Sequence, residues 1–393
     1  MQEFLKITFW FSLVMIFYAY FGYPLLLSLI SLFRKKEVIR KEITPNVSFI
    51  ITAYNEENKI KDKLENTLEI DYPRRLFEII VASDCSTDKT DDIVRQYASQ
   101  GVRLVRANVR KGKEHAQKLA VEAASGKILI FSDVGTILEP DAVKNIVSNF
   151  ADPSVGCVSS VDRFINPDGS ISGEGAYVKY EMFLRSLESK VNTLVGLSGS
   201  FFAARREVCQ DWADDLQSDF NTVLNSVKRG LRGISDPSTI GYYKNIADEK
   251  KEFSRKVRTV LRGISVLMRN LVLLNPLKYG MFSWQLLSHK LCRWMVPFFL
   301  FLAFFLNTIL VLHNSSLVYD LLFAAQVSFY FLAMIYYILH ALSKSNKESK
   351  PGSFLQLLKI PYYFLLVNAS ILVAWIKYFR GERAVFWEPS KRV

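Results

Sequence analysis

The sequence predicts an α/β domain with a parallel sheet, set between membrane-spanning segments. Three observations lead to this prediction. The 393 residues are 50% hydrophobic with a mean hydropathy of +0.13, although 22% are charged, so the apolar residues must be segregated. Of the 38 acidic residues, 33 lie between Arg34 and Arg293, which leaves both ends of the chain apolar. Between Val47 and about Ala247, strand patterns and helix patterns alternate.

The first apolar segment, Ile7 to Phe33, has no charged residue and is long enough for a helix to cross a bilayer. It lacks a small-residue cleavage site and is followed by basic residues, which predicts a retained anchor with its C-terminal end in the cytoplasm. Two more spans are predicted at Trp294 to Tyr319 and Leu321 to Ser343, joined by a turn around His313 to Ser316.

A fourth apolar segment, Ile360 to Ile376, is shorter and contains Pro361. A crossing here would place the basic tail outside, against the positive-inside rule, so the segment either spans or lies in the interface as a re-entrant element. We therefore predict a multi-pass protein of the cell membrane in five parts: a transmembrane anchor at 1–33, a cytoplasmic α/β domain at 34–252, basic amphipathic interface helices at 253–293, a transmembrane hairpin at 294–343, and a third C-terminal apolar segment with the tail at 344–393.

Composition excludes disorder, collagen and a disulfide scaffold. The four cysteines lack the spacing of a thiolate zinc site and suit a reducing compartment. The net charge is +12, and no acidic residue occurs between Phe253 and Tyr319, where basic and apolar residues interleave. With membrane spans on both sides, this pattern indicates a bilayer surface as the partner and no nucleic acid.

Within the α/β domain, four apolar runs predict buried strands, each followed by a helix pattern: Val47 to Thr52, Phe77 to Ala82, Val102 to Val105, and Ile128 to Phe131. The helices are expected from Glu56, from a cap at Ser86 or Thr87 through Tyr97, at His115 to Ala124, and from about Pro140. This alternation predicts a parallel sheet with right-handed crossovers, whose ligands bind beyond the carboxyl ends of the strands.

Polar residues stand at those carboxyl ends, but no glycine-rich dinucleotide fingerprint or P-loop is present. Asp84 and Asp88 follow the second strand and could equally cap a helix. Asp133 follows the fourth strand directly, which makes a ligand-binding role the stronger interpretation. Lys113 could instead be a solvated loop charge.

Taken together, the motifs form an ordered set: Thr52 to Glu56, Asp84 to Asp88, Gly112-Lys113, Phe131 to Asp133 with Glu139 to Asp141, Gly199 to Arg205, Ser218-Asp219, and Arg255 to Arg258. This order resembles membrane-bound family 2 glycosyltransferases of the poly-N-acetylglucosamine, hyaluronan and cellulose synthase-like group. The resemblance implies that residues 34–252 have the GT-A fold, a Rossmann-like mixed sheet that binds nucleotide-diphospho-sugars.

The resemblance also implies roles for individual residues. Asp219 would be the catalytic base of an inverting transfer, and Asp133 would bind Mg²⁺ or Mn²⁺, as a hard carboxylate ligand can. The donor, a nucleotide-sugar and foremost a UDP-sugar, would be bound by Thr52, Tyr54, Glu56, Asp84, Lys113, Ser132, Asp133, Arg255 and Arg258. A saccharide or lipid-linked acceptor would be bound by Ser198, Gly199 and Ser200.

The sequence departs from the family pattern at three motifs. The metal motif reads Asp133-Val134-Gly135 with one carboxylate, the base motif reads Ser218-Asp219, and Thr259 stands where the synthases carry tryptophan. The missing tryptophan favours limited sugar addition over long-chain synthesis. A non-catalytic scaffolding subunit of a polysaccharide-synthesis complex is the alternative function, and a homo-oligomer or export partners are possible assemblies.

Overall fold

The computed structural model describes residues 1–165, 176–244, 249–313, 316–343 and 353–384. The chain divides into two compact units. The sheet unit comprises Leu26–Ala247, Arg262–Leu286 and Arg383–Val393, and the helical unit comprises Met1–Leu25, Asp248–Leu261 and Leu287–Glu382. Each unit is described separately below.

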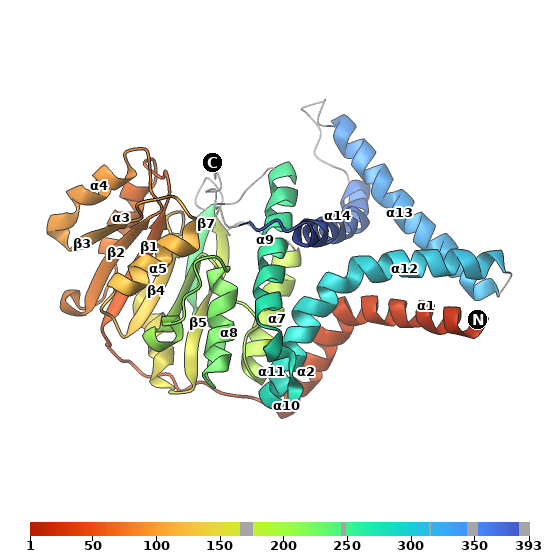
Figure 1. Cartoon of the computed structure of the whole chain (residues 1–393), viewed down its shortest axis with the longest axis horizontal. Helices are drawn as coiled ribbons and strands as arrows, with labels where there is room; N and C mark the ends of the chain where they lie inside the picture. The colour runs from red at the N-terminus through yellow and green to blue at the C-terminus, as the bar shows by residue number, and fades with distance from the viewer. Residues whose placement is uncertain (166–175, 245–248, 314–315, 344–352, 385–393) are drawn as a thin grey trace. The chain divides into compact units, whose positions relative to one another are not determined.

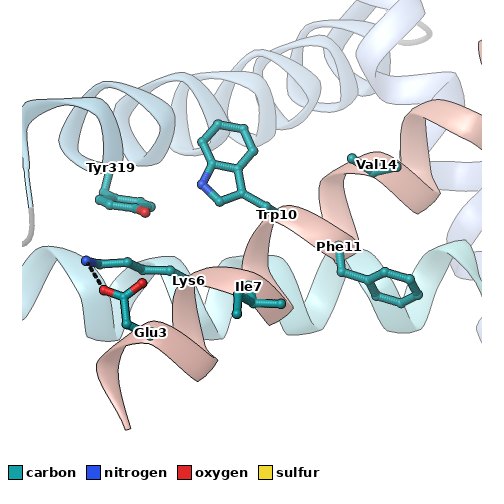
Figure 2. A pocket seen from close by; sticks show the side chains of 7 residues that line it. All are labelled: Glu3, Lys6, Ile7, Trp10, Phe11, Val14 and Tyr319. Atoms are coloured by element: carbon teal, nitrogen blue, oxygen red, sulfur yellow. Dashed lines mark hydrogen bonds and ion pairs between the residues drawn. The ribbon is translucent and has the colours of Figure 1, made fainter.

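The sheet unit is built on one seven-stranded sheet in the order β3-β2-β1-β4-β6-β5-β7, which can be followed in Figure 1. The four strands β3, β2, β1 and β4 are parallel, as predicted, and β6 then runs antiparallel to both β4 and β5. The sheet is therefore mixed. The strands are β1 Val47–Ala53, β2 Phe77–Ser83, β3 Val102–Arg106, β4 Ile128–Asp133, β5 Val155–Ile165, β6 Phe201–Arg205 and β7 Arg232–Lys244.

The core lies where alternate residues of the strands meet the covering helices. All seven residues of β1 are buried, and Val47, Phe49, Ile51 and Ala53 belong to the main hydrophobic cluster. On the sheet, α5 packs against β1 and β2, and α8 packs against β5 and β7. The helices of this unit are α3 Ile60–Leu68, α4 Thr90–Gln96, α5 Lys113–Ala123, α6 Ala142–Ser148, α7 Ala176–Val191, α8 Ser218–Lys228, α10 Pro276–Tyr279 and α11 Met281–Leu286.

Several predicted boundaries differ from the structure. The helix expected from Glu56 begins at Ile60, and the one expected from about Pro140 begins at Ala142. Helix α4 begins at Thr90, after Lys89, so neither Ser86 nor Thr87 caps it. The Thr90 amide donates to Asp88 Oδ1 at 2.9 Å in the turn before the helix. The predicted acceptor loop from Gly199 to Arg205 is a loop only up to Ser200, since Phe201–Arg205 pairs with β4 and β5 as strand β6.

The turns that end β1 and β2 both use left-handed backbone. Asn55 has φ of 51° and Cys85 has φ of 58°, which few residues other than glycine adopt. Asn55 compensates through its side chain, whose Oδ1 accepts the Thr87 amide at 2.8 Å. This hydrogen bond joins the two turns, so the residues after β1 and β2 are held together at one edge of the sheet.

The helical unit contains α1 Gln2–Phe17, α12 Arg293–Leu312, α13 Leu317–Ser343 and α14 Ser353–Phe379, while α2 Tyr23–Phe33 and α9 Glu249–Arg269 belong partly to each unit. Short π-helical turns, Tyr18–Gly22 and Leu287–Cys292, precede α2 and α12. Among the described residues, four helices are long and apolar enough to cross a membrane: Gln2–Phe33, Met281–Leu312, Leu317–Leu342 and Leu357–Phe379. The fourth of these helices contains the predicted segment Ile360 to Ile376, so both alternatives for this segment, spanning and re-entrant, stay open.

The contacts of α14 with α12 lie near the start of α12. Phe364 packs against the cluster of Ala19, Cys292 and Val296, which includes the start of α12, and Trp375, eleven positions later, donates to the Trp294 carbonyl at 3.0 Å. A helix running alongside α12 would contact a different level after three turns. Figure 1 shows α14 foreshortened while α1 and α12 lie across the view. We infer that α14 crosses α12 near one end, and its place in a membrane stays a prediction.

Candidate active site

Lys113, Asp133 and Gly199 meet at the carboxyl end of β4. Lys113, at the start of α5, places its Nζ 2.5 Å from Asp133 Oδ1 and 2.9 Å from the Gly199 carbonyl oxygen. The lysine is 7% exposed, whereas the side chain of Asp133 is 25% exposed. Lys113 is therefore a buried, paired cation at the predicted donor edge, which excludes the solvated-charge alternative.

Asp219 lies close to the same glycine. It lies in the first turn of α8, where the helix N-terminus favours a negative charge. Its Oδ2 accepts a hydrogen bond from Gln217 Nε2 at 3.1 Å. A Cβ atom added at Gly199 would lie only 2.6 Å from this Oδ2, so the carboxylate occupies space that any side chain at residue 199 would need. The structure thus brings the predicted base, the predicted metal ligand and Lys113 around one residue.

This packing makes Gly199→Ala a specific probe. The added methyl group must displace the Asp219 carboxylate, and a displacement of about 1 Å can cost about 10²-fold in turnover. We expect kcat to fall by that order while donor affinity, measured by calorimetry, stays close to wild type. The matched control is Gly156→Ala, whose Cβ would lie 2.8 Å from Leu231 Cβ. Equal losses of kcat in both variants, at equal folded fractions, would contradict the role of residue 199.

Asp84 is fully buried and already bonded at both carboxylate oxygens. Oδ1 accepts the Lys111 amide at 3.0 Å and Oδ2 accepts the Gly112 amide at 2.9 Å. Burial raises the pKa of Asp84, and these two amide hydrogen bonds oppose that rise. In this state Asp84 fixes the loop that leads into Lys113. A contact between Asp84 and a nucleobase stays a prediction.

The other predicted donor residues of the sheet unit fall into two groups. Tyr54 is half-buried, and the Arg110 guanidinium carbon lies 3.9 Å from its ring centroid, a cation–π contact that the sequence did not indicate. Thr52 and Ser132 are buried strand residues, and the amide of Glu56 donates to Thr90 Oγ1 at 2.8 Å. Thr52 Oγ1 is buried and has no hydrogen-bond partner among the residues that the structure describes.

Arg255 and Arg258 lie on α9 in its helical-unit part, so their predicted contact with the donor stays a prediction. The part of α9 that belongs to the sheet unit forms an ion pair next to Lys113. Arg262 forms an ion pair with Glu114, the residue after Lys113, and both side chains are nearly buried. Because a buried pair is costly to break, this contact fixes the start of α5.

Lys63 is a buried lysine that the sequence analysis missed. It lies on α3, only 2% exposed, and its Nζ donates to the Thr136 carbonyl at 2.6 Å, just after Asp133. Burial lowers the pKa of Lys63 to about 7, although the negative charge of Asp133 opposes the shift. The signal was present in the sequence, because Lys63 stands between Ile60 and Leu64 on the apolar face of a short helix.

The lowered pKa of Lys63 predicts a pH effect on stability. Below about pH 7 the lysine is protonated in both states, but between 7 and its ordinary 10.5 only the unfolded chain binds the proton. The free energy of unfolding should therefore rise with pH in this range, by about 1.4 kcal/mol per pH unit. The measurement is thermal unfolding in detergent at several pH values from 7 to 9. Plotted against pH, the melting temperatures of wild type and Lys63→Met should give curves that diverge. Lys61→Met, at an exposed lysine of the same helix, is the control, and parallel curves for Lys63→Met would contradict the prediction.

A divalent metal can be held here only with help from a ligand's own oxygens. Among the described ranges, no group of three or more His, Cys, Asp or Glu side chains is placed to bind a metal ion. Asp133 offers a partly exposed carboxylate, and its Oδ2 accepts no hydrogen bond from a described residue. Mg²⁺ is commonly bound by one or two carboxylates together with substrate phosphates and water. The donor set thus fits a metal that arrives with a diphosphate.

Comparison with known proteins agrees with this site. Residues 48–212 match the family model described as glycosyl transferase family 2. The poly-beta-1,6-N-acetyl-D-glucosamine synthase of Staphylococcus epidermidis is 23% identical over 354 residues, covering 83% of this chain and 82% of the relative. The enzyme of the same name from Staphylococcus aureus strain MSSA476 is 28% identical over 210 residues, covering 51% of this chain and 49% of the relative.

Among solved structures, the mannosyltransferase PcManGT from Pyrobaculum calidifontis superposes with a TM-score of 0.73 at 22% identity. The match covers 96% of this chain and 100% of that chain. This likeness, together with the mixed sheet, confirms the predicted GT-A fold. The chain therefore contains a family 2 glycosyltransferase domain, and it is a glycosyltransferase similar to the poly-N-acetylglucosamine synthase group.

Proposed function

We propose that this protein is a membrane-integral inverting glycosyltransferase of polysaccharide or glycan biosynthesis. It moves a sugar from a nucleotide-sugar to a hydroxyl of a saccharide or lipid-linked acceptor at the cytoplasmic face of the cell membrane. The observation that carries this proposal is the convergence on Gly199. Lys113 binds its carbonyl at 2.9 Å, and Asp219 lies against its Cα. A buried cation that can bind phosphate and a candidate base thus both lie against one residue.

The chemistry follows from this arrangement. Asp219 takes the proton from the acceptor hydroxyl while that oxygen attacks the anomeric carbon and the bond to the diphosphate breaks. Such a transfer needs one base, unlike glycoside hydrolysis with its two carboxylates. Lys113 is placed to exchange its contact with Asp133 for the leaving diphosphate, whose negative charge grows during the reaction.

A bound divalent ion would be held by Asp133 and the donor phosphates, and it would supply Lewis-acid stabilisation of the leaving group. The mannosyltransferase neighbour was solved with GDP-Man and Mn²⁺, which supports a metal of this kind without separating Mg²⁺ from Mn²⁺. Arg258 is proposed as a further cation for the diphosphate.

The donor is to be identified by a screen of the detergent-purified protein for release of free nucleoside diphosphate. UDP-N-acetylglucosamine comes first, since the motifs imply a UDP-sugar and the staphylococcal relatives are named for N-acetylglucosamine, and GDP-mannose comes second. Release from one donor, lost in Asp219→Asn, supports the proposal. No release from any donor, with or without acceptor extracts, would favour the non-catalytic scaffold instead.

A further inference from the structure

Asp162 is a carboxylate that none of the predicted roles includes, and it lies beside the 198–200 loop. Its Oδ1 accepts hydrogen bonds from Ser198 Oγ at 2.5 Å and Ser200 Oγ at 3.3 Å, and the two hydroxyl oxygens are 2.8 Å apart. Hydrogen bonds to an ionised acceptor are about twice as strong as neutral ones, so this carboxylate fixes the loop. Its Oδ2 accepts no hydrogen bond within the ranges that the structure describes.

Aromatic side chains stand next to this carboxylate. Asp162 and Phe164 are two positions apart on β5 and therefore share one face of the strand. Phe164 pairs in register with Tyr243 of β7, and their rings meet edge to face with centroids 5.0 Å apart. The Tyr243 hydroxyl lies 3.4 Å from Ser200 Oγ. From Val161 to Ile165 the strand is only half-buried, so this group borders a surface that a ligand can reach.

The hydrogen-bonding chemistry of the group defines its ligand. An ionised carboxylate can only accept hydrogen bonds, and the Ser198 hydroxyl already donates its hydrogen bond to Asp162. A ligand must therefore bring hydrogen-bond donors to these oxygens and an apolar face to the aromatic edge. A sugar ring with free hydroxyls meets both requirements.

The group is also tied to the reacting centre through the backbone. Gly199 lies between the two serines, its carbonyl binds Lys113, and its Cα abuts Asp219. On the donor side, the Asp133 amide donates to the Ser200 carbonyl at 3.0 Å. A saccharide held at Asp162 would thus lie one residue away from the base.

We propose that Asp162 is the residue that selects the acceptor. Its free oxygen accepts a hydrogen bond from a second hydroxyl of the acceptor sugar and so orients the attacking hydroxyl toward Asp219. This inference rests on the proposed function and names a specificity-determining residue for it.

The test is Asp162→Asn, with labelled sugar followed into acceptor and into water. Asparagine keeps an oxygen for Ser198 and Ser200 but replaces the free oxygen with an amide group that donates. Acceptors are supplied as a membrane extract of the cells that make the protein. We expect kcat/KM for the acceptor to fall by about 10- to 100-fold, which is the effect of losing a hydrogen bond to a charged group. Donor KM and donor hydrolysis by water should change by less than about threefold.

Asp236→Asn is the matched control. Asp236 also accepts serine and threonine hydroxyls, but Asn149 and Arg40 occupy its two oxygens as well, so it has a structural role only. Asp162→Asn would overturn the inference if it transferred like wild type, or if it lost hydrolysis and transfer in step as a folding defect does. Wild-type protein that releases no diphosphate from any donor would instead refute the proposed function itself.

Discussion

Asp219→Asn should lower sugar transfer by roughly 10²-fold or more while donor binding remains, because the amide cannot take the acceptor's proton. The substitution barely changes volume. It also keeps an oxygen that can accept the Gln217 amide, which now lies 3.1 Å from Oδ2, so the first turn of α8 should be preserved. Steady-state rates of nucleoside diphosphate release with acceptor present give the measurement, and calorimetry gives the donor affinity.

The control for this experiment is Asp211→Asn, a nearby aspartate whose side chain is 78% exposed and pairs with Arg229. A surface ion pair of this kind contributes little, so this variant should turn over like wild type. Near-wild-type turnover by a well-folded Asp219→Asn protein would remove Asp219 from the role of base.

Asp133→Ala should abolish metal-dependent donor binding, and exhaustive chelation of the wild type should have the same effect. The diphosphate needs a cation, and the motif that usually carries two acidic residues has Gly135 in the second position. Asp133→Asn is a necessary companion, because removal of the whole side chain also strips the buried Lys113 ammonium of its partner at 2.5 Å.

Donor titrations with and without Mn²⁺ separate these effects for the two Asp133 variants. Asp141→Ala, at an exposed aspartate after the same strand, should keep the metal dependence of wild type. If the wild type binds donor equally well after chelation, the metal assignment is wrong, and Lys113 or Arg258 must balance the diphosphate charge without it.

The first half of the fold could be predicted because its strands are rich in β-branched and aromatic residues, although Glu78 and Arg103 interrupt two of them. All four predicted strands are present and extended by one or two residues, since β-branched and aromatic side chains leave few alternatives in a doubly covered sheet. Strand β6 was missed as a strand because Phe201 to Arg205 is short, and because its antiparallel pairing with β4 and β5 depends on contacts far along the chain.

The site residues that stand in a sequence motif could be predicted. Asp133 was found from its place after a strand and Lys113 from the family resemblance, and the structure joins them directly. Lys63 was overlooked, although its place between Ile60 and Leu64 was a signal, since the contact with Thr136 depends on the fold. Asp162 was given no site role, because its partners Ser198 and Ser200 lie far along the chain. Residue type alone carries no trace of such partners.

The close approach at Gly199 has a consequence for how variants of this site are to be interpreted. Lys113, Asp219, Ser198 and Ser200 are all positioned through one residue, so a shift in any of them is transmitted to the others. Free-energy losses at contacting residues are not additive, and deviations of about 0.5–3 kcal/mol are common. Single substitutions here will thus not measure separate contributions. Only double-mutant cycles across residue 199 can divide the rate enhancement between leaving-group stabilisation and proton removal.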